Sequence, residues 1–371
     1  GSEMCIRDSD YGATWRSIVS GLPADQYAHV VRQSPRNPNL LFAGLEQGVW
    51  VSFDRGKHWQ SLQLDMPPSS VADLQIAYND LIAGTHGRSF FILDDLRPLE
   101  ALAGARASEA YLFKPQPAVR AWRWWTSGYG TGAGECCAPS DRFAGENPPP
   151  GAEVSYYLAS ASGSAIRFDV SDASKHVVAH FKGPSRAGIN RVSWDLTEPG
   201  PVPWLSARPW NQGPSEGAVV IPGKYVLTMH AGTVTQSQPL DVVGDWRARG
   251  AWGQPMSWRE PPEYAARHDF TKALLDELSA IDIALNDLDA RAKHRPLTAA
   301  ERLAYDALTS NPRNSEDDLF RPDRLREQVQ TLLLDIDLSQ RPPTDAQRAE
   351  AARVDALYAK VIARYKALPH R

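Results

Sequence analysis

The stretch VSFDRGKHW, residues Val51 to Trp59, sets the plan of the N-terminal part of the chain. It has the form S-x-D-x-G-x-x-W, in which Ser52 and Asp54 carry short polar side chains that can cap the backbone of a tight turn. Gly56 can take the left-handed conformation that such a turn needs, and Trp59 re-enters a hydrophobic core. We therefore expect a β-hairpin that is fastened by its own turn.

An earlier copy of this pattern, Asp10–Trp15 (DYGATW), keeps the D-x-G-x-x-W part. We call residues 10–15 the first box and residues 52–59 the second box. Asp10 and Asp54 are 44 residues apart, and so are Trp15 and Trp59. A four-stranded β-propeller blade has a period of roughly 40 to 50 residues. Short β-type runs separated by Gly, Pro and Asn turns fit one such blade at 29–31, 40–44, 49–51 and 59–62.

A second unit, with strands expected at 71–76, 80–84 and 89–93, aligns on the first without a gap. The box pattern decays there, because Asp94-Asp95 keeps the acid but lacks the following Gly and Trp. Residues 10–99 are thus predicted to be about the last two blades of a propeller. Since a propeller needs at least about four blades to close, we expect the other blades upstream, as partners of this segment.

Composition bounds the class of protein. The chain has 371 residues, of which 42% are apolar and 23% charged, as in a soluble globular protein of two or three domains. A formal net charge of −4 without a long block of like charge argues against a nucleic-acid partner. No apolar run approaches the roughly 20 residues of a membrane helix, so no membrane span is expected.

The start of the chain, residues 1–9, resembles the translation of a sequencing adapter, and we expect it to be non-native and outside the fold. On this interpretation the native chain continues upstream, where any signal peptide would lie.

Residues 100–150 are rich in Pro, Gly, Arg and aromatic residues. We expect an extended connector whose Trp122, Trp124 and Trp125 side chains lie on a neighbouring domain; the alternative is an exposed aromatic platform for sugar. The adjacent Cys136-Cys137 pair fits neither a disulfide framework nor a zinc pattern. A thiol pair in a core or loop is expected, with a vicinal disulfide or a metal contact as the alternatives.

Two further domains are predicted. Residues 151–246 hold six or seven alternating strands, which indicate an antiparallel, immunoglobulin-like β-sandwich. Residues 247–371 change to helical periodicity, with capping boxes at Thr298–Glu301 and Thr344–Gln347, and should form three or four antiparallel helices. The acidic run 315–318 is expected to be a solvated turn, because the spacing of a calcium loop is missing. The predicted fold class is multidomain and mainly β, with a helical hairpin or bundle at the C-terminus.

The two boxes resemble the Asp-box, or BNR, repeat of sialidases, sortilin-type receptor ectodomains and propeller glycosidases. The runs SPRNPNLLFAG (34–44) and THGRSFFILDD (85–95) are similar to large bacterial BNR proteins called sortilin-like or glycosyl hydrolase-like. In those proteins a β-sandwich with a PG-x-Y-x-V strand, matched here by Pro222–Val226, and a helical tail follow the propeller. The resemblance covers residues 10–371 and implies a secreted, periplasmic or other cell-envelope location.

In Asp-box propellers the box lies between the third and fourth strands of a blade, and ligands bind at the opposite end. The resemblance therefore implies structural roles for the box residues, and it disfavours a catalytic Asp54. These structural residues are Asp10, Gly12, Trp15, Ser52, Asp54, Gly56 and Trp59.

The same register points to the opposite end of the blades. Glu46 and His86 occupy matching turns between the second and third strands, 40 residues apart, and should lie near each other. Arg88 and Asp73 would complete a polar cluster there. Such a cluster can perform acid-base chemistry or hold a carboxylate or sugar, and the alternative is hydrogen bonding between blades.

These observations favour a non-catalytic cell-envelope protein that binds a peptide or glycan. The second hypothesis is a glycoside hydrolase whose catalytic carboxylates lie mostly in upstream blades, so that this chain alone is inactive. The third is a structural module for assembly. No nucleophile elbow, phosphate loop or HExxH motif occurs, so catalytic residues stay unassigned and neither a cofactor nor a metal is expected.

Overall fold

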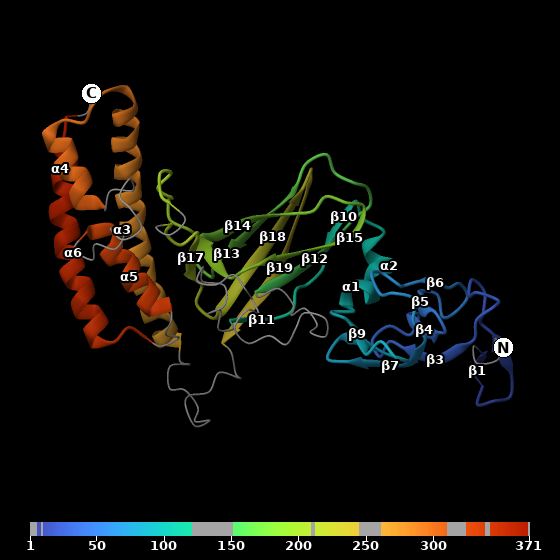
Figure 1. Cartoon of the computed structure of the whole chain (residues 1–371). Helices are drawn as coiled ribbons and strands as arrows, with labels where there is room; N and C mark the ends of the chain where they lie inside the picture. Colours follow the sequence, from blue (N-terminus) through green and yellow to red (C-terminus); the bar gives the residue numbers. More distant parts are fainter. Residues whose placement is uncertain are drawn as a thin grey trace.

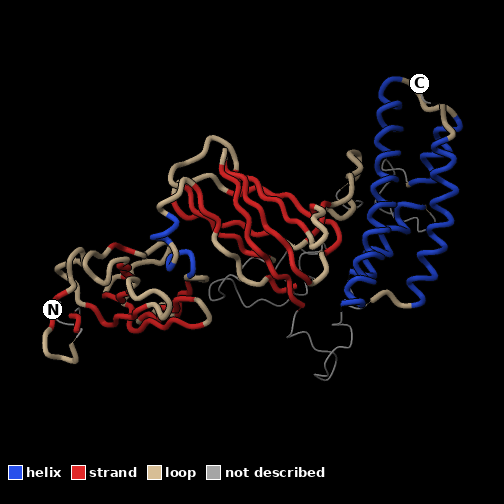
Figure 2. The backbone as a smooth tube through the Cα atoms, turned by 180° about the vertical axis from the view of Figure 1, so that it is seen from behind, coloured by secondary structure: helices blue, strands red, loops and turns tan. Residues whose placement is uncertain are grey.

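The computed structural model describes residues 6–8, 10–120, 151–208, 212–244, 261–309, 324–337 and 342–369. In this part the chain is mainly β, with a C-terminal helical region. The N-terminal sheets, a central pair of sheets and the helices follow one another in an elongated row (Figures 1 and 2). The tryptophans at 122, 124 and 125, the cysteine pair and the acidic run 315–318 lie outside the described residues.

Seven antiparallel strands form two N-terminal sheets. The four-stranded sheet has the order β3-β4-β5-β6, and the three-stranded sheet has the order β7-β8-β9. The strands of the first are β3 (Ala28–Gln33), β4 (Leu41–Leu45), β5 (Gly48–Ser52) and β6 (Gln60–Ser61). Those of the second are β7 (Val71–Ala77), β8 (Asp80–Thr85) and β9 (Phe90–Leu93). Side chains from both sheets, among them Phe42, Val51, Val71 and Leu74, share one hydrophobic core, which holds the two sheets together.

A further two-stranded sheet precedes these. Strand β1 (Ile6–Asp8) pairs antiparallel with β2 (Trp15–Ser17), so that the first box forms the connection between them. Three residues of the segment that the sequence places outside the fold thus take part in a sheet.

Two sheets in the centre of the chain enclose another core. The three-stranded sheet is β10-β12-β15, and the five-stranded sheet is β11-β19-β18-β13-β14, in which β11 runs parallel to β19. Tyr156, Phe168 and Leu227 are completely buried between them. The strands are β10 (Ala110–Leu112), β11 (Ala118–Arg120), β12 (Ala152–Leu158), β13 (Ile166–Ser171), β14 (Val177–Gly183), β15 (Gly188–Trp194), β18 (Gly223–Ala231) and β19 (Val234–Gly244).

The described residues of the C-terminal region contain four helices: α3 (Pro261–His294), α4 (Ala299–Leu308), α5 (Leu325–Asp337) and α6 (Asp345–Lys366). Both predicted capping boxes are confirmed, because Thr298 and Thr344 each accept a hydrogen bond from the backbone N–H three residues on. The apolar stripe of α3, which includes Leu278, Ile281 and Leu285, is buried against the other helices. In the described part of the chain, no helix is both long and apolar enough to cross a membrane.

A short hairpin of β16 (Thr197–Pro199) and β17 (Glu216–Val219) joins the central sheets to the helices. Trp204 lies in the segment that connects the two strands. It packs into the helical core, and its indole donates a 2.7 Å hydrogen bond to Asp289. Arg326, fully buried, pairs with Asp282 at 2.6 Å and lies over the Trp204 ring. The pair links α3 to α5, and removal of one member would leave an unpaired buried charge, which is strongly destabilising.

Two short helices, α1 (Arg97–Glu100) and α2 (Leu102–Ala105), lie between the N-terminal and central sheets (Figure 1). Glu100 accepts hydrogen bonds from Ser34 at 2.6 Å and from Arg36 at 2.7 Å. From the other side, Arg191 of β15 donates to the backbone carbonyls of Asp94 and Asp95. These hydrogen bonds join the N-terminal region to the central sheets.

Candidate functional site

The second box forms the turn between β5 and β6, the third and fourth strands of the four-stranded sheet. Ser52 Oγ donates to Asp54 Oδ1 at 2.9 Å and accepts from the Gly56 N–H at 2.8 Å. The Asp54 carboxylate accepts from the His58 N–H at 2.9 Å and lies 2.6 Å from His58 Nδ1. Burial alone would raise the pKa of Asp54, but the hydrogen bonds from His58 and Ser52 outweigh it and lower the pKa. The polar groups of the second box therefore form their hydrogen bonds with one another, within the turn.

Trp59 connects the second box to an earlier part of the chain. Its side chain is 5% exposed, its indole Nε1 donates to the Ile18 carbonyl at 2.6 Å, and its backbone N–H donates to the Ser20 carbonyl at 3.0 Å. The segment that follows β2 is thus bound to the four-stranded sheet through this tryptophan.

The first box repeats the turn but not the burial. Asp10 accepts from the Thr14 N–H at 2.8 Å and from the Thr14 hydroxyl at 2.7 Å, and Gly12 has a φ of 89° where Gly56 has 80°. Trp15, the counterpart of Trp59, is 60% exposed. The box turn therefore forms in both copies, whereas the contact of its tryptophan differs.

The predicted ligand residues lie at the other end of the strands. Glu46 follows β4, and its carboxylate accepts a hydrogen bond from the Tyr27 hydroxyl, which raises the pKa of Tyr27. Tyr27 packs edge-on against His29 with ring centroids 4.9 Å apart, and His29 Nε2 lies 3.3 Å from Ser70 Oγ. A series of contacts therefore starts at the turn after β4 and crosses to the second sheet.

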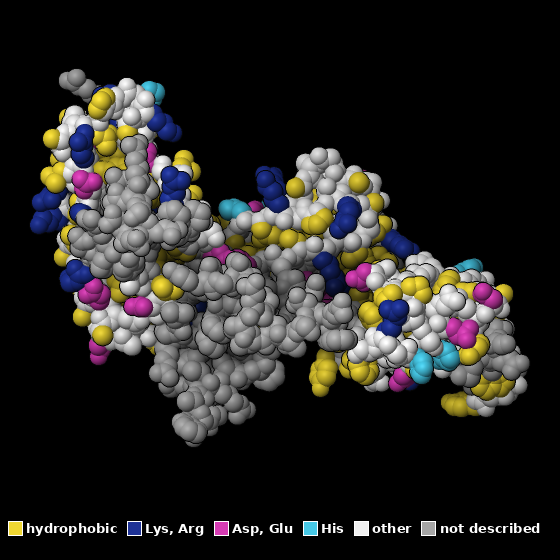
Figure 3. All heavy atoms as spheres, in the orientation of Figure 1, with side chains coloured by type: hydrophobic (Ala, Val, Ile, Leu, Met, Phe, Trp, Pro, Cys, Tyr) yellow, Lys and Arg dark blue, Asp and Glu magenta, His cyan; other side chains and the backbone are white. Residues whose placement is uncertain are grey.

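The turn after β8 also contacts Ser70, the last residue of this series. The His86 N–H donates to the Ser70 carbonyl at 2.8 Å, and Thr85 holds the turn by donating to the Ser89 carbonyl at 2.8 Å. His86 and Arg88 are both exposed, and Figure 3 shows histidine side chains at the surface of the N-terminal region. We call Tyr27, Glu46, His86 and Arg88 the turn cluster: Tyr27 contacts Glu46, the His86 backbone contacts Ser70, and Arg88 follows in the same turn as His86.

Asp73 has a different position. It lies on β7 and pairs with Arg32 of β3 at 2.7 Å, across the boundary between the two N-terminal sheets. Both side chains are well exposed, so this ion pair contributes about 0.2–1 kcal/mol at most. For Asp73 the contact matches the alternative that the sequence left open, hydrogen bonding between neighbouring sheets.

Sequence reasoning missed Tyr27 and His29. The signal was present, because both lie just before or within the first strand of the unit with one residue between them, which places them on the same face of an extended segment. The repeat register points only to the turns between second and third strands, whereas Tyr27 and His29 reach the same end from the first strand.

Among the described residues, no group of three or more His, Cys, Asp or Glu side chains is arranged to hold a metal ion. The turn cluster instead combines one carboxylate (Glu46), a phenol ring, an imidazole and one guanidinium.

No known protein family matches the sequence, and no curated protein matches it. Two solved structures of the extracellular domain of BT4673 from B. thetaiotaomicron match, one named as a one-component and the other as a hybrid two-component system. Their identities are 11% and 10%, each covers 65% of this chain, and each has a TM-score of 0.20. The matched part is 28% of the length of those chains, and at this TM-score the likeness carries no argument about fold or function.

Proposed function

We propose that this chain is part of a cell-envelope protein of the sortilin-like BNR type, which binds a peptide or a glycan at the turn cluster. In this proposal the two N-terminal sheets are consecutive blades of an Asp-box propeller, and residues 151–246 are an immunoglobulin-like sandwich. Support comes from the second box, which joins the third and fourth strands of its sheet. The core that the β10-β12-β15 sheet shares with the five-stranded sheet supports the sandwich.

The observation that carries the binding function is the meeting of two strand-end turns in one exposed cluster. The His86 backbone is fixed by Ser70, while its imidazole and the nearby Arg88 guanidinium are exposed. Tyr27 is 47% exposed and adds an aromatic surface. A guanidinium, an imidazole and a phenol ring suit a ligand with a carboxylate or several hydroxyl groups beside an apolar face.

Binding is favoured over catalysis by the state of the two carboxylates. Glu46 accepts the Tyr27 hydrogen bond and Asp73 pairs with Arg32. A glycoside hydrolase needs two carboxylates about 5 to 10 Å apart that act on one bond, whereas the turn cluster has a single carboxylate, Glu46, and Asp73 pairs with Arg32 outside the cluster. The hydrolase hypothesis therefore places the catalytic pair in other blades.

A structural role is the second candidate function, and the Arg32–Asp73 pair favours it, because it joins the two sheets without involving a ligand. Loss of this pair should then change stability and leave binding intact, which separates the two functions.

A paired array experiment tests the proposal. The full chain is applied to a glycan array and to a peptide array, and each retained class is measured again with His86→Ala and Arg88→Ala variants. We expect at least one ligand class to bind and to weaken about tenfold or more in the variants, since each removes a direct donor. Binding that is unchanged in both variants would contradict the site. Release of reducing sugar by this chain alone would favour the hydrolase.

A further inference from the structure

Two acidic side chains meet between α3 and α6 in the helical region. Glu277 of α3 forms a hydrogen bond with the side chain of Asp355 of α6. Ten residues further along both helices, the Tyr365 hydroxyl donates to Asp287 at 2.8 Å. Because the two contacts have the same spacing on both helices, α3 and α6 run in the same direction (Figure 1). We call Glu277–Asp355 the acid contact and Asp287–Tyr365 the tyrosine contact.

The acid contact requires a proton. An ionised carboxylate only accepts hydrogen bonds, so two carboxyl groups can bond to each other only when one of them is protonated. Glu277 is half-buried, and its Oε2 is buried without a hydrogen-bond partner, which disfavours a charge on this group. Asp355 is exposed, so water can stabilise its charge. Glu277 is therefore the donor and Asp355 the acceptor.

The helices around the acid contact offer Glu277 no counter-charge in the part of the chain that the structure describes. Burial, together with the hydrogen bond and the charge of Asp355, raises the pKa of Glu277 to about 8, and no cation acts against them. The other charged or titratable side chains on the facing stretches of these helices are Lys272 and Asp276 of α3, Arg326, Glu327 and Asp335 of α5, and Glu350, Arg353, Tyr358 and Lys360 of α6. Of the cations, Lys272, Arg326 and Arg353 already pair with other carboxylates.

The tyrosine contact has different chemistry. Burial, with the hydrogen bond to Asp287, raises the pKa of Tyr365 to about 12, so the phenol keeps its proton over the range in which Glu277 titrates. Arg291 pairs with Asp287 at 2.8 Å and also donates to the Pro369 carbonyl at 3.0 Å, beyond the end of α6. The C-terminal half of α6 is thus attached to α3 by groups that do not change charge near neutral pH.

We infer that α6 docks on α3 through a proton shared by Glu277 and Asp355, and that loss of this proton as the pH rises loosens the half of α6 that ends at Asp355. Once Glu277 is ionised, two carboxylates face each other without a hydrogen between them, and the buried Oε2 has no donor to stabilise its charge. The tyrosine contact keeps the C-terminal half in place. This pH-dependent docking does not depend on the function proposed for the turn cluster.

Folding takes up a proton at Glu277. Its pKa is raised in the folded chain above the ordinary value of 4.5, so its stabilising contribution is fully present below about pH 4.5 and is lost as the pH rises through about 8. Between these values, each pH unit raises the equilibrium constant for opening by up to about tenfold, the effect of one proton. Since Asp355 is exposed and its charge is screened by water, we expect about three- to tenfold per pH unit.

Hydrogen exchange of the full chain tests the inference, with each rate divided by the intrinsic rate at the same pH. Peptides that cover residues 346–355 report the half of α6 before the acid contact, and peptides that cover residues 359–366 report the half after it. Between about pH 6 and about pH 8, the opening constant of the first half should rise about three- to tenfold per pH unit. That of the second half should change less than about twofold over the same range.

The variant Glu277→Gln keeps a donor for Asp355 and has no proton to lose, so its opening constant should stay within about twofold across this range. The matched control is Glu350→Gln on α6. The hydrogen bond from Arg353 lowers the pKa of Glu350, so this group does not titrate in the range, and the control should keep the wild-type slope. Asp355→Asn removes the charge that faces Glu277 and should reduce the slope.

Three results would overturn the inference: a flat profile in the wild-type chain, equal slopes in the wild type and Glu277→Gln, or the same slope in both halves of α6. The last would mean that the helix opens as a whole, without a separate role for the acid contact. If Glu277→Gln does not fold, Asp355→Asn still tests the shared proton, because an unreduced slope in that variant would contradict it.

Discussion

The two boxes have the same turn and different surroundings. In both, an aspartate accepts the backbone N–H four residues on, and a glycine has a left-handed backbone. Trp59 is buried and bonded to the Ile18 carbonyl, whereas Trp15 is mostly exposed. The motif thus specifies a local turn by itself, while the stability that it adds depends on whether its tryptophan has another segment to pack against. Substitutions made in parallel at the two boxes test this difference.

The largest difference is expected for the tryptophans. Trp59→Ala should lower the free energy of opening of the second box by about 3–5 kcal/mol, the usual cost of removing a buried large aromatic side chain. Trp15→Ala should change the opening of the first box by less than about 0.5 kcal/mol, as for an exposed position. Hydrogen exchange of peptides that cover the two turns measures both. Similar losses at the two positions would contradict the comparison.

The glycines should differ next. A Cβ at Gly56 would lie 2.8 Å from Ile18 Cδ1 and 3.0 Å from its Cβ, while one at Gly12 would meet nothing within 4 Å. Both have a positive φ, so alanine costs about 1 kcal/mol in backbone strain at either position. The steric conflict should bring the cost of Gly56→Ala to about 2–3 kcal/mol. Chemical denaturation followed at each box would show equal costs if the contact with Ile18 were unimportant.

The polar locks should show a smaller difference. Ser52→Ala removes a buried hydroxyl that accepts from the Gly56 N–H and donates to Asp54, for a loss of about 1–2 kcal/mol. Asp10→Ala removes an exposed acceptor for Thr14, for about 0.5–1 kcal/mol. Amide exchange at Gly56 and at Thr14 reports each directly. A larger effect at the exposed first box would reverse the ranking.

Acid should weaken the second box slightly. The pKa of Asp54 is lower in the folded chain than in the unfolded chain, so its contribution is present above the unfolded pKa of about 3.8 and is lost as the pH falls through the lower folded value. Because the side chain is partly exposed, a few tenths of a kcal/mol are expected. Exchange of the box between about pH 5 and pH 3 should show this loss in the wild type and not in Asp54→Asn. An identical slope in both would contradict the assignment to Asp54.

Local patterns predicted much of the fold. The four-strand and three-strand units, the strands of the central region and both helix caps follow from alternation, turn residues and capping chemistry that act over a few residues. The short strands β10 and β11 and the helices α1 and α2 were not predicted, since segments of three or four residues carry too little periodicity.

Long-range contacts could not be predicted. Trp204 bonds to Asp289, 85 residues further on, and nothing in the sequence around either residue indicates the pairing. At the turn cluster, the register located Glu46 and His86, but the intervening Tyr27 and His29 required the structure.

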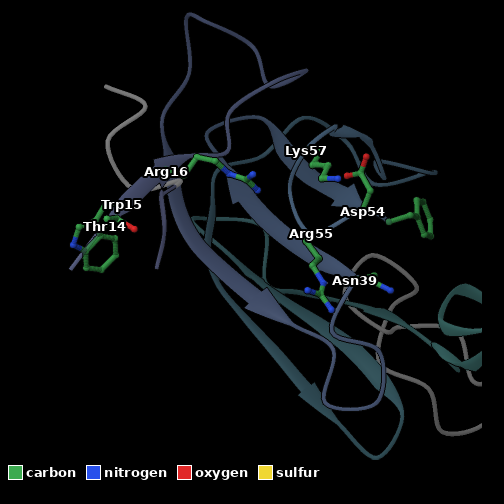
Figure 4. A pocket seen from close by; sticks show the side chains of 8 residues that line it. Thr14, Trp15, Arg16, Asn39, Asp54, Arg55 and Lys57 are labelled. Atoms are coloured by element: carbon green, nitrogen blue, oxygen red, sulfur yellow. Dashed lines mark hydrogen bonds between the residues drawn. The ribbon is translucent and has the colours of Figure 1, made fainter. Parts of the chain in front are cut away.

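The central claim is that Trp59 fastens the second box to the segment after β2, whereas Trp15 makes no equivalent contact with the residues that the structure describes (Figure 4). Protection of the two indole N–H groups from exchange, measured by NMR with Trp59→Phe and Trp15→Phe variants to assign the signals, tests it most directly. We predict that the Trp59 N–H, bonded to the Ile18 carbonyl at 2.6 Å, is strongly protected, and that the Trp15 N–H exchanges at nearly the rate of a free indole. Equal protection of the two, or rapid exchange at Trp59, would contradict the account.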